Sequence, residues 1–314
     1  MKKFNKPALS FSAQIAKLAE RGLVITDQRV VEQFLRKVSY FRLSGYTRPF
    51  YQPTDAVGGN HRFKDGTTFD DIVSLYEFDR ELRLLTFSAI DRIEIAFRTA
   101  AMNHLCIGYG THWFERPELF YDGFPHGAFL KELELSFAAN PVTGARSEDF
   151  LDHYFKAYGD PSSPPGWMIA EILSLGTWSK VYNNLTSIRD RKAIAAELGW
   201  SHVLVESWIH MLTILRNLCA HHGRIWNRTY SIRPKMPAKD PLFDGLTWND
   251  QSFAAQAIVV HALLSKSYPD AYWPRQLAEL LSRYPKVKIG VMGFTIHWKK
   301  QKFWGIDPPL DSGL

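Results

Sequence analysis

The sequence has little cysteine and no long hydrophobic run. Cys106 and Cys219 are its only cysteines, and both lie in apolar segments with helical spacing. This excludes a disulfide-rich secreted scaffold and fits a reducing compartment. No run of about 18 apolar residues occurs, and residues 1–23 are basic without an uninterrupted apolar core. We therefore expect a cytoplasmic protein with neither a membrane span nor a signal peptide.

The alternating pattern of β-strands is also nearly absent. Only residues 286–296 (KVKIGVMGFTI) alternate, and we expect a short hairpin there. Elsewhere apolar residues recur at helical spacing, which predicts an all-α fold. The expected helices are 10–23, 26–46 with Thr26 as N-cap, 67–105, 127–139, 147–158, 166–185, 187–198, 201–223, 250–267 and 275–283.

Residues 67–105 form the longest periodic segment and contain neither Pro nor Gly. We expect one very long helix there, or two helices joined by a slight bend. Thr68 and Asp71 have the spacing of a capping box at the start of this segment. Acidic residues precede basic ones by four positions, the favourable order on a helix. These pairs are Asp79–Arg83 and Glu94–Arg98.

Two loop-forming stretches divide the chain. Residues 52–67 are rich in Gly, Pro, Asp and Asn, and residues 231–241 (SIRPKMPAKDP) are rich in Pro. We expect an N-terminal helical region at 1–51, a helical core at 66–235 and a small helical lobe at 242–314.

The composition is that of a globular protein with a basic surface. Hydrophobic residues make up 46% and charged residues 22%, while the net charge is +6 and the isoelectric point about 9.1. Such a surface attracts polyanions, including nucleic acid.

The segment LRNLCAHHGRIWNR (215–228) lies at the end of the expected helix 201–223. Successive residues turn by about 100°, which gathers Val203, Leu204, Trp208, Met211, Leu212, Ile214, Leu215, Leu218 and Cys219 on an apolar half. A polar stripe of Glu206, His210, Thr213, Asn217 and His221 follows the other half, with Arg216 at its edge. If the helix persists that far, His222 points toward the apolar half, where we expect it to pack, cap the helix or form an internal hydrogen bond.

Arg216 and His221 on one groove suit cleavage of RNA. An imidazole can accept the proton of a ribose 2′-OH or protonate the leaving 5′-oxygen. A guanidinium stabilises the charge that develops on the phosphate. Asn217 would orient the imidazole or the phosphate, and His222 is a less certain member of the site. This chemistry requires no metal and no cofactor.

Basic and aromatic residues alternate after this helix and suit single-stranded RNA. They are Arg224, Trp226, Arg228, Tyr230 and Arg233. Arg42 and Arg48 lie among five aromatics in SYFRLSGYTRPFY (39–51) and are further RNA-binding candidates. The alternative for that stretch is a helix end stopped at Gly45 and packed by its rings.

At these residues the sequence resembles a known family. LRNLCAHHGRIWNR is similar to the signature of the Abi (abortive infection) proteins of the AbiD/AbiF type, within the HEPN superfamily of helical ribonucleases. Arg216, Asn217 and His221 match the superfamily motif of Arg, four to six residues, then His. RGLVI, VSYFRLSGYTRPFY and PPGWMIAEILSLGTWSKVYNNL also read like family blocks, so the resemblance covers most of residues 6–230.

The resemblance implies a HEPN-like helical bundle with phage-defence ribonuclease activity. Because such enzymes pair two motifs, it implies a homodimer, and its relatives suggest a regulatory non-coding RNA as partner. Arg98 and His104 match the bare motif too, but on the long helix we interpret them as structural.

Two other functions are compatible with these residues. A metal hydrolase would use His202, His210, His221 and His222, but the first two lie about 12 Å apart along the helix, too far for one ion. A non-catalytic protein that complexes a small non-coding RNA would use Arg216 and His221 only to contact phosphate.

Overall fold

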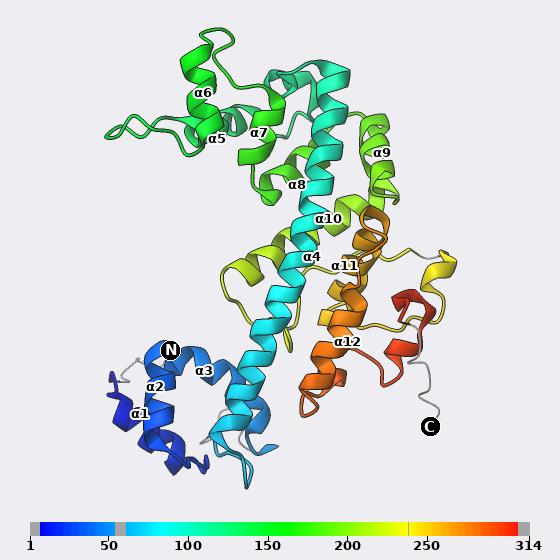
Figure 1. Cartoon of the computed structure of the whole chain (residues 1–314). Coiled ribbons are helices and arrows are strands. Elements are labelled where there is room, and N and C mark those ends of the chain that lie inside the picture. The colour runs from blue at the N-terminus through cyan, green and yellow to red at the C-terminus, as the bar shows by residue number, and fades with distance from the viewer. Residues whose placement is uncertain (1–6, 54–60, 238, 307–314) are drawn as a thin grey trace. The chain divides into compact units, whose positions relative to one another are not determined.

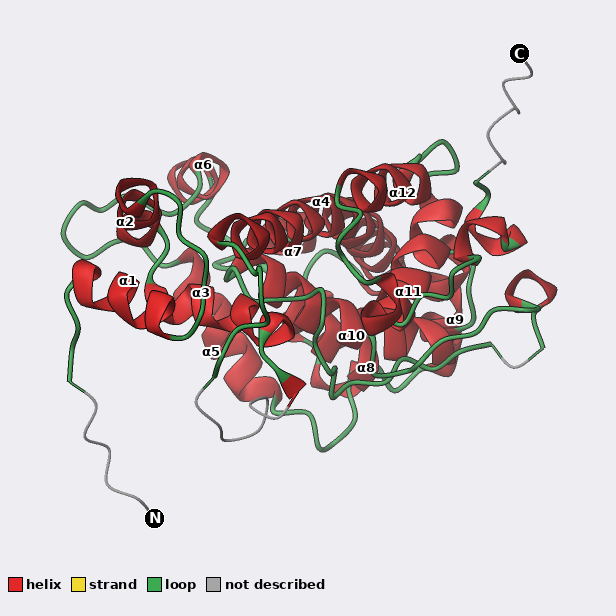
Figure 2. Ribbon diagram, turned by 90° about the horizontal axis from the view of Figure 1, so that it is seen from below, coloured by secondary structure: helices red, strands yellow, loops and turns green. Residues whose placement is uncertain are grey.

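The computed structural model describes residues 7–53, 61–237 and 239–306. This part contains twelve α-helices and several short 3-10 turns, and no β-strand occurs within it. Figure 2 accordingly shows only helices and loops. Extended pairing within these ranges is limited to isolated bridges, such as Phe120 with Leu185. The predicted all-α fold is confirmed.

Figure 1 labels the helices along the chain. Their bounds are α1 Phe11–Glu20, α2 Gln28–Lys37, α3 Tyr40–Thr47, α4 Phe69–Tyr109, α5 His126–Phe137, α6 Asp149–Ala157, α7 Gly166–Ile172, α8 Leu175–Asn184, α9 Ile188–Glu197, α10 His202–Ala220, α11 Phe253–Ser267 and α12 Trp273–Arg283.

Residue contacts divide the chain into two compact units. The N-terminal unit comprises residues 1–83 and 279–288, and the main unit comprises 84–278 and 289–314. Helices α4 and α12 each contribute residues to both units. The finer division at residues 52–67 and 231–241 stays a prediction.

In the N-terminal unit the expected helix 26–46 is two helices. Asp27, not Thr26, caps α2 by accepting a hydrogen bond from the amide of Arg29 at 2.8 Å. Val38 is extended and Ser39 caps α3, so the chain turns between them. Gly45 lies inside α3 and does not stop it, because the helix continues to Thr47. The predicted single helix and its end at Gly45 were therefore wrong.

Helix α4 is a single helix of 41 residues, the first of the two arrangements that its unbroken pattern predicted. Its capping box is present: Asp71 accepts a hydrogen bond from the Thr68 amide at 3.0 Å, and Thr68 accepts one from the Asp71 amide at 3.1 Å. This reciprocal pair satisfies two amide groups that the first helical turn leaves without partners.

Helix α10 forms the centre of the main unit and packs against α8, α9 and α11. Gly176 of α8 allows α8 and α10 to pack closely, because a Cβ there would lie 3.3 Å from Thr213 of α10. Trp208, Ile209 and Leu212 are fully buried. At 19 residues and a mean hydropathy of 1.2, α10 has the length and composition of a membrane span. In this structure 39% of that apolar window is buried within the protein, and a single helix of this kind is weak evidence for a span.

Two further predictions were wrong. The expected helix 166–185 is split into α7 and α8, because the Ser174 side chain accepts a hydrogen bond from the Thr177 amide and starts a new helix. The expected hairpin at 286–296 is absent. This segment contains a 3-10 turn at Ile289–Met292, and Gly293, which follows the turn, takes a left-handed φ of 88°. Alternation in so short a segment does not determine a strand.

Candidate functional site

Helix α10 ends three residues before the position expected from its sequence. The amide of His222 donates to Cys219 O at 3.2 Å, and that of Gly223 donates to Leu218 O at 2.7 Å. These two bonds form a Schellman motif with His221 as the C-cap. The motif closes the helix by satisfying carbonyl groups that would otherwise lack partners.

His222 occupies the left-handed position of this motif, with φ of 58°. Glycine is the usual residue there because a Cβ makes the conformation cost roughly 1 kcal/mol. His222 is exposed and lies beyond the helix, so the helix does not continue far enough to turn its side chain toward the apolar half. Its amide takes part in the cap, as one of the predicted alternatives had it. Two consecutive histidines, His221 and His222, are therefore exposed at the end of α10.

The polar stripe of α10 lies on the accessible side of the helix. His210, Asn217 and His221 are exposed, and Glu206 and Thr213 are half-buried. Most of the opposite half packs inward, but Val203 is 41% exposed, and Val205 and Ile209 are buried although the helical wheel did not place them there. Leu204, Ile214 and Leu218 are half-buried. The order of the stripe was thus predictable from spacing alone.

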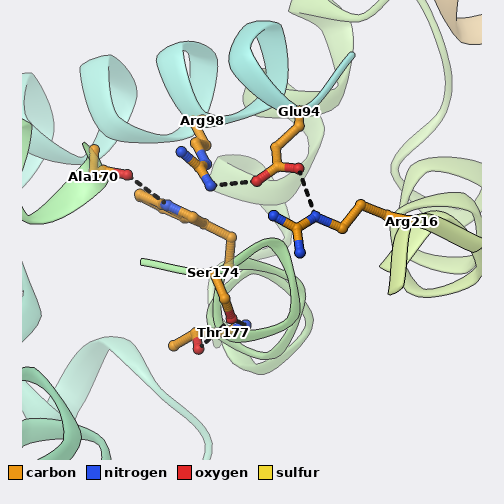
Figure 3. Close-up of polar contacts among 7 residues, drawn as sticks. Glu94, Arg98, Ala170, Ser174, Thr177 and Arg216 are labelled. Carbon is orange, nitrogen blue, oxygen red and sulfur yellow. Dashed lines mark hydrogen bonds and ion pairs between the residues drawn. The ribbon is translucent and has the colours of Figure 1, made fainter. Parts of the chain in front are cut away.

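Arg216 reaches α4 and contacts a buried carboxylate. Its Nε lies 3.7 Å from Glu94 Oε2, and Glu94 also accepts a hydrogen bond from Arg98. Figure 3 shows the Glu94 carboxylate between the two guanidinium groups. Glu94 is 7% exposed, whereas the Arg216 side chain is 34% exposed. We call Glu94, Arg98 and Arg216 the open cluster.

The open cluster carries one uncompensated positive charge, since two guanidiniums share one carboxylate. The Nε atoms of Arg98 and Arg216 are buried and have no hydrogen-bond acceptor. The Arg216 guanidinium also lies 5.8 Å from the centre of the Phe87 ring. A half-exposed guanidinium whose buried Nε faces a carboxylate is suited to bind an anion such as phosphate with its terminal nitrogens.

No hydrogen bond or ion pair joins Arg216 to His221 in the part of the chain that the structure describes. The two residues lie five positions apart, about 140° around the helix axis. Asn217 accepts a hydrogen bond from the His221 amide at 2.9 Å through its backbone oxygen. A catalytic role for Arg216, Asn217, His221 and His222 stays a prediction.

The predicted RNA-binding tail is only partly accessible. Trp226 and Tyr230 are 3% and 4% exposed, so their rings pack in the core and cannot stack on a base. The proposed RNA contact of Trp226 is corrected on that ground. Arg228 is exposed, Arg224 is half-buried, and Arg233 is exposed with Asp250 at 3.5 Å. In the N-terminal unit, Arg42 and Arg48 are both exposed.

His104 is held by a carboxylate that sequence analysis did not find. Its Nε2 lies 2.9 Å from Asp190 of α9, and Tyr109 donates to the same carboxylate at 2.5 Å. Burial alone would raise the pKa of Asp190, but the hydrogen bonds from Tyr109, His104 and Ser187 outweigh it and hold the pKa below its usual range. The contact joins residues 86 positions apart, for which no local pattern exists.

No group of three His, Cys, Asp or Glu side chains among the described residues is placed to hold a metal ion. His202 is half-buried at the start of α10, and His221 lies at its other end.

The comparisons with known proteins give one match. A model of the family described as Abi-like protein matches residues 33–227, which include α4, the open cluster and both histidines at the end of α10. No curated protein and no solved structure matches the chain. Because the family model spans more than half of the sequence, the protein belongs to the Abi-like family, whose name refers to abortive infection.

Proposed function

We propose that this protein is a metal-independent endoribonuclease of the HEPN type, close to the AbiD/AbiF proteins, that acts in phage defence. One observation carries the proposal. The Arg216 side chain is 34% exposed and carries the surplus positive charge of the open cluster, on the helix that ends in two exposed histidines. A phosphodiester with a neighbouring 2′-OH is the substrate that uses both groups.

In this mechanism the ribose 2′-oxygen forms a bond to phosphorus while the bond from phosphorus to the 5′-oxygen breaks. His221 takes the proton of the 2′-OH, and Arg216 stabilises the charge on the non-bridging oxygens. The 5′-oxygen receives a proton from a second imidazole, that of His222 or of a histidine in a second copy of the chain. The products are a 2′,3′-cyclic phosphate and a free 5′-OH.

Glu94 acts as a positioning residue in this proposal. Arg216 has a long, flexible side chain, and the ion pair at 3.7 Å limits the orientations of its guanidinium. Arg98 supplies the charge that keeps Glu94 satisfied, so the pairing does not cancel the positive charge of Arg216. A lysine could not replace Arg216 here. The planar guanidinium can donate two parallel hydrogen bonds to phosphate oxygens, whereas the ammonium of lysine acts as a point charge.

The resemblance to HEPN enzymes extends the proposal to partners. We propose a homodimer in which the two α10 ends form one composite site, with a structured non-coding RNA as a regulator. Light scattering of the purified chain should give twice the mass of 36.1 kDa. A monomeric mass at micromolar concentration would contradict the composite site.

The test is cleavage of labelled single-stranded RNA in EDTA by protein stripped of nucleic acid. We expect a 2′,3′-cyclic phosphate product, and a loss of about 10²–10⁴-fold in rate for His221→Ala and for Arg216→Ala. Arg216→Lys should remain impaired because lysine lacks the fork.

The matched control is His210→Ala, which removes another exposed histidine from the same stripe of α10 and should cleave normally. RNA with a 2′-deoxyribose at the cleaved position should be resistant. Tight RNA binding without cleavage by the wild-type protein would instead favour the second candidate, a non-catalytic protein that complexes a small RNA. Cleavage that EDTA abolishes would contradict a metal-independent enzyme.

A further inference from the structure

The positive charge of the protein is concentrated in the N-terminal unit. Residues 1–83 and 279–288 contain 17 Lys and Arg against 11 Asp and Glu, a net charge of +6, whereas the main unit contains 21 of each. Counting only described residues, the net charges are +4 and +2, although the main unit is more than twice as long. A polyanion is therefore attracted most strongly, per residue, to the N-terminal unit.

Helix α2 presents this charge as a stripe. Arg29, Gln33 and Lys37 are spaced by four residues, fall within about 80° of one another around the helix and are all exposed. No carboxylate pairs with Arg29 or Lys37 within the described ranges. The acidic residue of this helix, Glu32, is instead bound to Arg36 at 2.6 Å. Arg29 and Lys37 thus place two uncompensated positive charges about 12 Å apart along the helix.

An exposed aromatic ring follows the stripe along the chain, on helix α3. The chain turns at Val38 and Ser39 into α3, whose first turn carries Phe41 and Arg42. Phe41 is 89% exposed, while the neighbouring Leu43 is 1% exposed and anchors the helix in the core. A phenylalanine so exposed contributes little to packing, and it follows Lys37 by four residues in the sequence, in the first turn of α3.

We propose that Arg29, Lys37, Phe41, Arg42 and Arg48 form a binding surface for single-stranded RNA, separate from the cleavage site and in a different unit. The inference deepens the proposed ribonuclease function by assigning substrate capture to the N-terminal unit. Cations along a groove or ridge follow the phosphates, and an exposed ring stacks on an unpaired base. A duplex would leave Phe41 unused, because its bases are already stacked.

A membrane surface fits these residues less well. An interfacial helix exposes a continuous apolar face, whereas Val31 and Leu35 of α2 are 2% and 1% exposed. The exposed apolar residue of α2 is Val30, at 53%, next to a row of polar side chains. Two isolated apolar side chains do not make an inserting face.

The experiment measures binding of a fluorescent single-stranded RNA whose 2′-oxygens are methylated, so that it cannot be cleaved through them. For full-length Arg29→Gln/Lys37→Gln, we expect weaker binding and a salt dependence reduced by about 1.4 in the slope of log K against log salt. For Phe41→Ala, we expect roughly tenfold weaker binding with an unchanged slope.

Matched controls lie in the main unit. Lys131→Gln/Lys156→Gln removes the same charge from exposed positions of α5 and α6, and Leu135→Ala removes a side chain that is 69% exposed. Both should bind RNA almost as the wild-type protein does. Equal losses in the N-terminal and control variants, or none in either, would overturn the proposal.

Two further measurements distinguish this RNA-binding surface from a membrane site and from the cleavage site at the end of α10. If the N-terminal variants keep RNA affinity but lose binding to vesicles of anionic lipid, the surface is a membrane site and the proposal fails. Cleavage of a dinucleotide, whose single phosphodiester is the bond that is cut, reports on the α10 site alone. A wild-type protein that never cleaves, but whose RNA binding depends on Phe41 and Lys37, would refute the ribonuclease and support the binding surface.

Discussion

Helix α4 carries two carboxylate–arginine pairs of the same i,i+4 design, and the protein encloses them differently. Asp79 is fully buried and Arg83 is 5% exposed. Tyr46 of α3 donates to Asp79 at 2.6 Å and accepts a hydrogen bond from Arg83 at 3.3 Å. We call these three residues the closed cluster. Its charges balance, and a neutral hydroxyl completes it.

The open cluster starts from the same pattern and ends with a different third member. Glu94 and Arg98 receive a second guanidinium, that of Arg216, in place of a hydroxyl. The side chains of Arg98 and Arg216 are 18% and 34% exposed, so the surplus charge reaches solvent. The difference teaches that the local pair is a structural unit, and that the third group decides whether the charge of the cluster is balanced or in excess.

The largest expected effect is on the closed cluster. Asp79→Asn leaves the Arg83 guanidinium buried without a counter-charge, and we expect the free energy of unfolding to fall by about 3–5 kcal/mol. Urea unfolding followed by circular dichroism measures the change. Cleavage of RNA per folded molecule should stay the same. A loss below about 1 kcal/mol would mean that the two clusters do not differ in this way.

Glu94→Gln is the matching change in the open cluster, with a smaller effect on stability. Both guanidiniums retain access to water, so we expect a loss of about 1–2 kcal/mol. The rate of RNA cleavage should fall by about ten- to a hundredfold, because Arg216 loses the carboxylate that orients it. Unfolding and single-turnover cleavage are measured on the same preparation. Wild-type cleavage by this variant would remove Glu94 from the proposed site.

The smallest expected effect on stability comes from the Tyr46 hydroxyl, which has no counterpart in the open cluster. Burial and the Asp79 charge raise the pKa of Tyr46 far above its ordinary value of about 10. Because the unfolded chain releases this proton first, stability is complete below pH 10 and falls by about 1 kcal/mol per pH unit above it.

Tyr46→Phe should cost about 1 kcal/mol at neutral pH through its lost hydrogen bonds. The variant should also lose less stability than the wild-type protein between pH 10 and 11, so that the two unfolding midpoints converge. The other tyrosines whose pKa values are raised contribute the remaining slope in both proteins; they are Tyr40, Tyr109, Tyr154, Tyr182 and Tyr284. Parallel pH curves would show that Tyr46 is accessible to base in the folded state.

Sequence spacing predicted those features that arise within one helix. The capping box at Thr68 and Asp71, the pairs of α4 and the polar stripe of α10 all follow from residues three or four positions apart. Spacing did not predict the partners of these groups, because Arg216 and Asp190 reach α4 only through the tertiary fold.

Local breaks were the other source of error. Ser39 and Ser174 each start a new helix inside an apolar pattern that continues without interruption, so periodicity alone could not locate them. The left-handed conformation of His222 was also hidden, since glycine, the residue that usually marks it, comes one position later at Gly223.

The sharing of Glu94 also constrains how this site can change during evolution. A single substitution of Glu94 would leave two half-buried arginines facing each other, whereas replacing Glu94 and Arg98 together by an apolar pair removes one charge of each sign. We therefore expect these two positions to covary among relatives, while Arg216 stays unchanged wherever cleavage is retained.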